Sequence, residues 1–166
     1  VAVSKFHPNE SIEQAYRAGQ RIFGESKVQE LTGKYETLPK DIEWHFIGHL
    51  QTNKVKYIAP YIAMIHAVDS YKLLAEIDKQ AAKNGRVIPC LLEIHIAQEE
   101  SKYGFTFQEC REMLEAGEWK NLTHICIAGL MGMATFTEDE TEIKKEFDSL
   151  KQFFNEIKQN YFADRD

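Results

Sequence analysis

Short apolar runs alternate with longer amphipathic segments along the whole chain. The apolar runs are predicted β-strands and cover residues 1–5, 21–25, 42–48, 64–69, 88–97 and 124–134. Several of them carry Val, Ile or Leu at consecutive positions, as is typical of strands that are buried on both faces. Strict alternation of strands and helices predicts a parallel sheet with right-handed crossovers.

Helix signals fill the segments between these runs. The clearest is a stripe of apolar side chains at helical spacing near the end of the chain, formed by Ile143, Phe147, Leu150, Phe154, Ile157 and Tyr161. Residues that favour helix N-termini precede this and other predicted helices: Asn9 or Ser11, Ser70, and the capping-box pairs Ser26 with Gln29, Thr106 with Glu109 and Thr137 with Glu140.

Two α/β architectures fit this order, an open doubly wound sheet and a (β/α)8 barrel of which about six βα units are present. Six units in 166 residues give roughly 28 residues each, so eight would need roughly 220, which lies within the usual range for such barrels. Both architectures bind ligands at the carboxyl ends of their strands. Candidate chemistry is therefore sought there.

Lys5 lies at the end of the first predicted strand. Strand alternation puts Val1, Val3 and Lys5 on one side, which in a barrel would bring the amine to the mouth. Apolar walls disfavour the charged ammonium, so the neutral amine becomes available for imine formation with an aldehyde. Taken alone, a surface lysine at the start of a loop is the commoner explanation of such a residue.

The third predicted strand runs into Trp44-His45-Phe46-Ile47-Gly48-His49-Leu50-Gln51-Thr52-Asn53-Lys54. This stretch resembles the signature of the YggS/PROSC family of pyridoxal phosphate homeostasis proteins. Other blocks resemble that family in the same order and together cover essentially the whole chain: Val1–Lys5, Phe23–Glu30, Val68–Ser70, Ser101–Gly104 and Gly129–Met131.

The resemblance implies one barrel domain of the alanine racemase N-terminal type over residues 1–166. We expect this domain to be incomplete at both ends, because the chain opens on Val1 inside a strand and stops just after a helix. It also implies a function in pyridoxal 5′-phosphate (PLP) and vitamin B6 homeostasis, without a dedicated enzymatic reaction. PLP would be held as an internal aldimine on Lys5.

Two further residues are candidates for contact with the cofactor. Ser26 stands where the family usually has Asn, which is placed to reach PLP, although Ser26 also fits a helix N-cap. Met131 could contact the pyridine ring, with a core methionine as the alternative. The family's phosphate-binding blocks, which follow its seventh and eighth strands, are absent from this sequence, so we expect these residues to hold the cofactor's lysine without its phosphate cradle.

Two alternative functions remain open from the sequence. One is a PLP-dependent racemase or similar amino-acid enzyme on the same scaffold. The other is an aldolase that forms an imine at Lys5 without PLP. The homeostasis protein and the racemase would both show the absorption band of an imine-bound cofactor, whereas the aldolase without PLP would not.

Composition and charge limit the classes of partner that this protein is expected to bind. A net charge of −6 and a pI near 5.6 argue against nucleic acid, and no apolar run approaches the roughly 20 residues that span a membrane. Three unpatterned cysteines and the absence of a leader indicate a cytoplasmic protein. His45 and His49 straddle a strand end and do not form a zinc pair. We expect a monomer whose partners are small molecules: PLP, and amino or keto acids.

Overall fold

The computed structural model describes residues 1–100 and 103–165. Within them, six parallel strands form one sheet in the order β1-β2-β3-β4-β5-β6. The strands are β1 (Ala2–Val3), β2 (Ile22–Glu25), β3 (Glu43–Phe46), β4 (Met64–Val68), β5 (Ile88–Glu93) and β6 (Ile125–Met131). All six predicted strands are confirmed, each with shorter ends.

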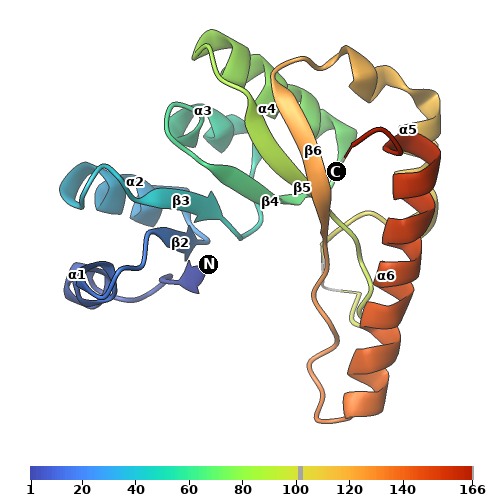
Figure 1. The fold of residues 1–166 in the computed structure, drawn as a ribbon, viewed down its shortest axis with the longest axis horizontal. Coiled ribbons are helices and arrows are strands. Elements are labelled where there is room, and N and C mark those ends of the chain that lie inside the picture. The colour runs from blue at the N-terminus through green and yellow to red at the C-terminus, as the bar shows by residue number, and fades with distance from the viewer. Residues whose placement is uncertain (101–102, 166) are drawn as a thin grey trace.

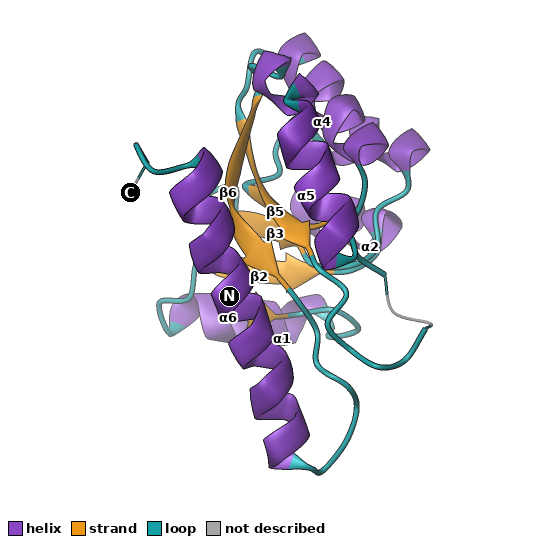
Figure 2. Ribbon diagram, turned by 90° about the vertical axis from the view of Figure 1, so that its right-hand side faces the viewer, coloured by secondary structure: helices purple, strands orange, loops and turns teal. Residues whose placement is uncertain are grey.

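A helix follows each strand. These are α1 (Asn9–Arg17), α2 (Val28–Thr37), α3 (Val55–Ile58), α4 (Tyr71–Lys83), α5 (Phe107–Ala116) and α6 (Glu140–Tyr161). Figure 1 shows α1 to α5 following the curved sheet from blue to yellow, while α6 runs beside β6. Figure 2 shows the same sheet from the side, with helices around it.

Sequential strand order decides between the two predicted architectures. A doubly wound sheet reverses its strand order at a switch point, whereas consecutive strands are neighbours throughout a β/α barrel. The order seen here contains no reversal among the described strands. It is the order of a barrel, of which β1 and β6 are the two edges in the described chain.

The core lies between the sheet and its helices. Side chains on one face of the strands, such as Phe23, Trp44 and Ile65, are buried against the helices, and the rings of Phe23 and Trp44 lie 6.0 Å apart. Alternation leaves Val1 and Val3 on the other face, where they are 56% and 55% exposed. The prediction that the strands are buried on both faces is therefore wrong for β1 within the described chain.

Some predicted helix signals are confirmed. The Ser70 side chain accepts the Leu73 N–H at the start of α4. Thr106 and Glu109 form a complete capping box at α5, in which each side chain accepts a backbone N–H of the other. Each cap satisfies backbone donors that the first helical turn leaves free.

Three other caps are predicted wrongly. Helix α1 begins at Asn9 itself, after Pro8. Helix α2 follows Lys27, one residue later than a cap at Ser26 would require. At α6, Asp139 accepts the N–H groups of Thr141 and Glu142, because the helix begins too late for Thr137 to reach it.

The apolar stripe of α6 is only partly buried. Of the stripe, Ile157 is buried and Phe147 is 45% exposed, while the other four side chains are half-buried. Figure 1 shows the reason, since the first half of α6 extends beyond the strands and has no sheet to pack against. The periodicity therefore predicts the helix correctly but overstates how much of it is core.

Candidate functional site

Lys5 lies in a tight turn directly after β1. The Ser4 N–H donates to the Gly24 carbonyl (3.0 Å), which extends the sheet by one residue, and the His7 N–H donates back to the Ser4 carbonyl (3.1 Å). Lys5 and Phe6 are thus the two central residues of a four-residue turn. Phe6 has a φ of +65° and Lys5 a negative one, the pattern of a type II turn. The predicted strand end at Lys5 is therefore wrong by two residues.

The amine of Lys5 is available. Lys5 is exposed and, within the described residues, makes no hydrogen bond or ion pair. Two neighbouring lysines differ: Lys34 is buried among oxygen acceptors, and the amine of Lys27 lies 5.1 Å from the Phe6 ring centroid. Of these three, Lys5 carries the amine best placed to react with a ligand from solution.

Lys5 and Ser26 follow the ends of neighbouring strands, β1 and β2, whereas Met131 lies on β6 at the other edge of the sheet. Val3 pairs with Gly24, and Lys5 and Ser26 each lie two residues further along. Ser26 is half-buried at the end of β2. Met131 ends β6, where it pairs with Glu93 and accepts the Ile94 N–H. The described sheet thus brings Lys5 and Ser26 to adjacent strand ends and puts Met131 at the opposite edge.

Gly48 lets the ends of β2 and β3 approach closely. A Cβ added to Gly48 would lie 2.6 Å from the Ser26 carbonyl oxygen and 2.7 Å from the Ser26 Cβ. Real side chains do not tolerate such distances. The glycine of the signature run therefore fixes the edge of the sheet around Ser26.

Three residues from separate signature blocks meet at this edge. The His49 Nδ1 lies 3.2 Å from the Asp69 carboxylate, and the His49 ring stacks on Tyr103 with centroids 3.9 Å apart. His49 is exposed. Ser101 and Lys102, from the same block as Tyr103, lie outside the described residues.

Glu93 is a buried carboxyl at the end of β5. It is 2% exposed, and its Oε2 has no hydrogen-bond partner among the described residues. Burial, with a smaller contribution from the Asp69 carboxylate, raises the pKa of Glu93 to about 7. Glu93 can therefore hold a proton near neutral pH at the ligand-binding edge.

Buried His45 on β3 and half-buried His66 on β4 form a pair. The His45 Nδ1 lies 2.8 Å from the His66 Nε2, so one ring donates and the other accepts. Burial lowers the pKa of both imidazoles, and with the influence of His45 it lowers that of His66 to about 4. Both lowered pKa values favour the neutral form of the two imidazoles.

The cysteines are placed as small apolar residues. Cys90 and Cys110 are fully buried, and burial raises the pKa of each thiol to about 12, so their reactive thiolates are suppressed. No group of three or more His, Cys, Asp or Glu side chains that could hold a metal occurs among residues 1–100 and 103–165. Over the same residues, no helix is long and apolar enough to cross a bilayer.

A groove of about 940 Å³ adjoins the same edge from the outside. Its walls come from α2 and the segment after β3, and include Ser26, His49 and Lys54. Lys5 does not line it. We therefore do not place the cofactor's covalent anchor in this groove.

Comparison with known proteins identifies the family. The model of the alanine racemase N-terminal domain matches residues 2–165. A protein of Aquifex aeolicus named pyridoxal phosphate homeostasis protein is 36% identical, over 97% of this chain and 70% of its own length. One of Helicobacter pylori with the same name is 39% identical, over 95% and 72%. The chain belongs to the family of pyridoxal phosphate homeostasis proteins, whose domain is of the alanine racemase N-terminal type.

Solved structures agree on the fold. PipY of Synechococcus elongatus PCC7942 without PLP superimposes with a TM-score of 0.90 at 34% identity, over 96% of this chain and 74% of PipY. PipY with PLP bound gives 0.85 at 33% identity, over 97% and 74%. Alanine racemase of Clostridium difficile gives 0.74 at 14% identity, over 93% of this chain and 41% of the racemase, a likeness of fold alone. The predicted barrel of the alanine racemase N-terminal type is confirmed.

Several polar residues of the site escape sequence analysis. Glu93 interrupts an otherwise apolar strand, which is a signal that could have marked it. The partners of the two histidines, His66 and Asp69, are more than fifteen residues away from them along the chain. Such pairs are set by strand register, which a single sequence does not reveal.

Proposed function

We propose that this protein binds PLP and takes part in PLP homeostasis, with Lys5 as its Schiff-base residue. Relatives that match nearly the whole chain are named pyridoxal phosphate homeostasis proteins. The similar PipY structure holds PLP. Both findings support PLP as the ligand.

The exposed, unpaired amine of Lys5 is the observation that carries the assignment of the anchor. It lies at the carboxyl end of the first strand, the edge at which β/α barrels bind their ligands. PLP supplies an aldehyde. The neutral amine adds to the aldehyde carbon, and one water leaves as the C=N bond forms, so atoms and charge balance without another reactant.

Other residues would orient the cofactor. Ser26 lies on the neighbouring strand end and can offer a hydroxyl. Met131 would contribute only if the barrel curves back to bring its edge strands together. We assign no phosphate-holding residue, because the phosphate-binding blocks of the family do not occur in this sequence.

A homeostatic role is favoured over a racemase. The solved racemases are 13–16% identical to this chain, which covers 41–44% of each. They support the fold and not the reaction. We propose a PLP carrier or regulator that acts in the cytoplasm as a monomer.

The test is an absorption titration with PLP. The protein should develop the yellow imine band, and Lys5→Ala should abolish it. Lys27→Ala, which removes an exposed lysine beside the same turn, should leave it unchanged. An unchanged band in Lys5→Ala would refute the assignment of Lys5. A protein that forms no band and gains no thermal stability with PLP would refute PLP binding.

A further inference from the structure

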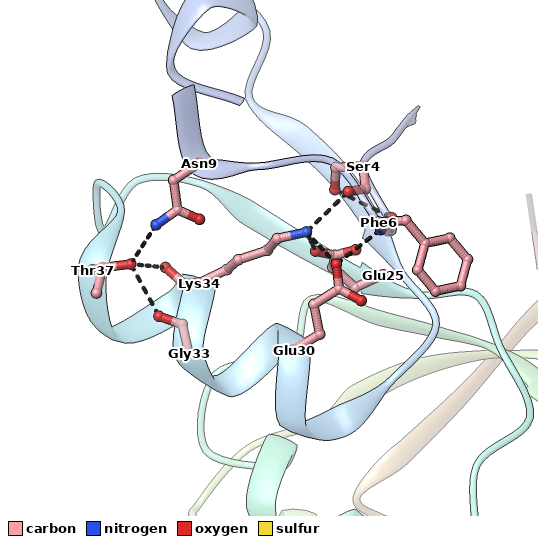
Figure 3. A network of polar contacts seen from close by, with 9 residues as sticks. Ser4, Phe6, Asn9, Glu25, Glu30, Gly33, Lys34 and Thr37 are labelled. Carbon is pink, nitrogen blue, oxygen red and sulfur yellow. Dashed lines mark hydrogen bonds and ion pairs between the residues drawn. The ribbon is translucent and has the colours of Figure 1, made fainter. Parts of the chain in front are cut away.

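Lys34 reaches from α2 to the backbone of the turn that carries Lys5. Lys34 is 6% exposed, and its ammonium donates to the Ser4 carbonyl (2.9 Å) and to the Glu30 Oε1 (2.7 Å). It also forms an ion pair with Glu25. Figure 3 shows the Lys34 side chain extended to this point, with its nitrogen between Ser4, Glu25 and Glu30.

The ammonium of Lys34 also compensates the charge of buried Glu25. Its carboxylate is completely buried at the end of β2, and Lys34 is its ion-pair partner. Burial raises the pKa of Glu25, while Lys34 opposes that rise. Removing only one partner of a buried ion pair leaves an uncompensated charge, which is strongly destabilising.

Glu30 holds the other side of the turn. Its Oε1 accepts the N–H of Phe6 at 2.8 Å as well as the Lys34 ammonium. The hydrogen bond from Lys34 is the main reason that the pKa of Glu30 is lowered, so Glu30 is ionised. The residues on both sides of Lys5 are therefore held by one charged cluster, while Lys5 itself is left free.

The turn needs such support. Phe6 has a φ of +65°, a left-handed backbone conformation that glycine adopts freely and that is unfavourable for a bulky residue. A charge-assisted hydrogen bond to the Phe6 N–H is strong enough to offset this cost. Without it, the backbone around Lys5 would relax toward other turn conformations.

We propose that Lys34, Glu25 and Glu30 are positioning residues that hold the Lys5 turn in the conformation required for reaction with the PLP aldehyde. This inference rests on the proposed function, since it assumes that Lys5 is the anchor. The cluster touches the backbone on either side of Lys5 and leaves the amine unprotected. Lys34 thus positions the turn, and Lys5 reacts with PLP.

Two variants, Glu30→Ala and Glu30→Gln, distinguish the effect of the hydrogen bond to the Phe6 N–H from the effect of the Glu30 charge. The alanine variant removes the acceptor of the Phe6 N–H, whereas the glutamine variant keeps an oxygen at that position. We expect Glu30→Ala to weaken imine formation with PLP about fivefold, the effect of one hydrogen bond, and Glu30→Gln to restore most of it. A matched control is Glu156→Gln, which breaks the ion pair of Arg111 with Glu156 between α5 and α6 and should leave imine formation unchanged.

Lys34 is tested with its partner, because Lys34→Met alone leaves Glu25 buried and unpaired. The double variant Lys34→Met with Glu25→Gln removes both charges and allows the protein to fold. It should form the imine more weakly than the parent. Equal imine formation in a folded double variant would contradict the role of Lys34.

Hydrogen exchange of the unloaded protein tests the inference independently of PLP. Glu30→Ala should speed exchange of the Phe6 amide, while Glu30→Gln should protect it. Equal protection in all three proteins, or equal imine formation in Glu30→Ala and the parent, would overturn the positioning role. If the parent forms no imine at Lys5 while the exchange pattern is as expected, the proposed function fails and the structural part of the inference stands.

Discussion

At the scale of single residues, the described edge of the sheet combines the exposed amine of Lys5 with several buried polar groups. Lys5 is exposed, whereas Glu25, Lys34, Glu93 and His45 are buried. The motifs of the sequence mark Lys5 as a candidate but give no sign that Glu25, Lys34 and Glu93 are buried. Burial of a charged residue depends on which partner another segment brings to it, as Lys34 shows with Ser4 from a strand thirty residues earlier.

Glu93→Gln should change how stability depends on pH. The pKa of Glu93 is raised from its ordinary value of 4.5 to about 7, so the folded protein holds a proton there that the unfolded chain has already lost. Stability from this group is therefore present at low pH and is lost as the pH rises from 4.5 to 7. Glutamine stays neutral, so the variant should gain about 3 kcal/mol over the parent at pH 8 and nothing at pH 4.

Urea unfolding at these two pH values measures the effect. Glu43→Gln is the control, because Glu43 is exposed on β3 and its loss should give no such difference between the two pH values. A Glu93→Gln protein that is less stable than the parent at pH 8 would show that the carboxylate form is needed by the fold.

At the scale of elements, the sequence predicts whether a segment is a strand or a helix better than it predicts the residues at which that element begins and ends. All six strands and the long helix α6 are where the periodicity puts them. The cap at Ser26 is wrong because a helix start is decided by one or two residues, and Ser26 instead packs against Gly48. Local capping patterns do not reveal such a contact between strand ends.

Two glycines should respond in opposite ways to alanine. Gly48→Ala puts a methyl group 2.6 Å from the Ser26 carbonyl oxygen and should cost about 1–3 kcal/mol of unfolding free energy. Gly33 lies inside α2 with no atom within 4 Å of an added Cβ, so Gly33→Ala should gain about 0.5–1 kcal/mol. Denaturant unfolding of both variants checks this, and a neutral Gly48→Ala would contradict the close approach of the two strand ends.

At the scale of the whole molecule, the pattern of strands and helices leaves two architectures open, and strand order selects one. The order of six sequential parallel strands is that of a barrel, and PipY and alanine racemase share it. The chain covers about 70% of the length of the first relatives it matches. We propose that residues 1–166 belong to one PLP-binding barrel domain.

The most direct test of the central claim is to locate the modified lysine. The protein is loaded with PLP, reduced with borohydride so that the imine becomes a stable secondary amine, digested, and mapped by mass spectrometry. The account predicts a phosphopyridoxyl group on Lys5 and an unmodified Lys34. Modification of another lysine in place of Lys5, in a protein that binds PLP, would contradict it.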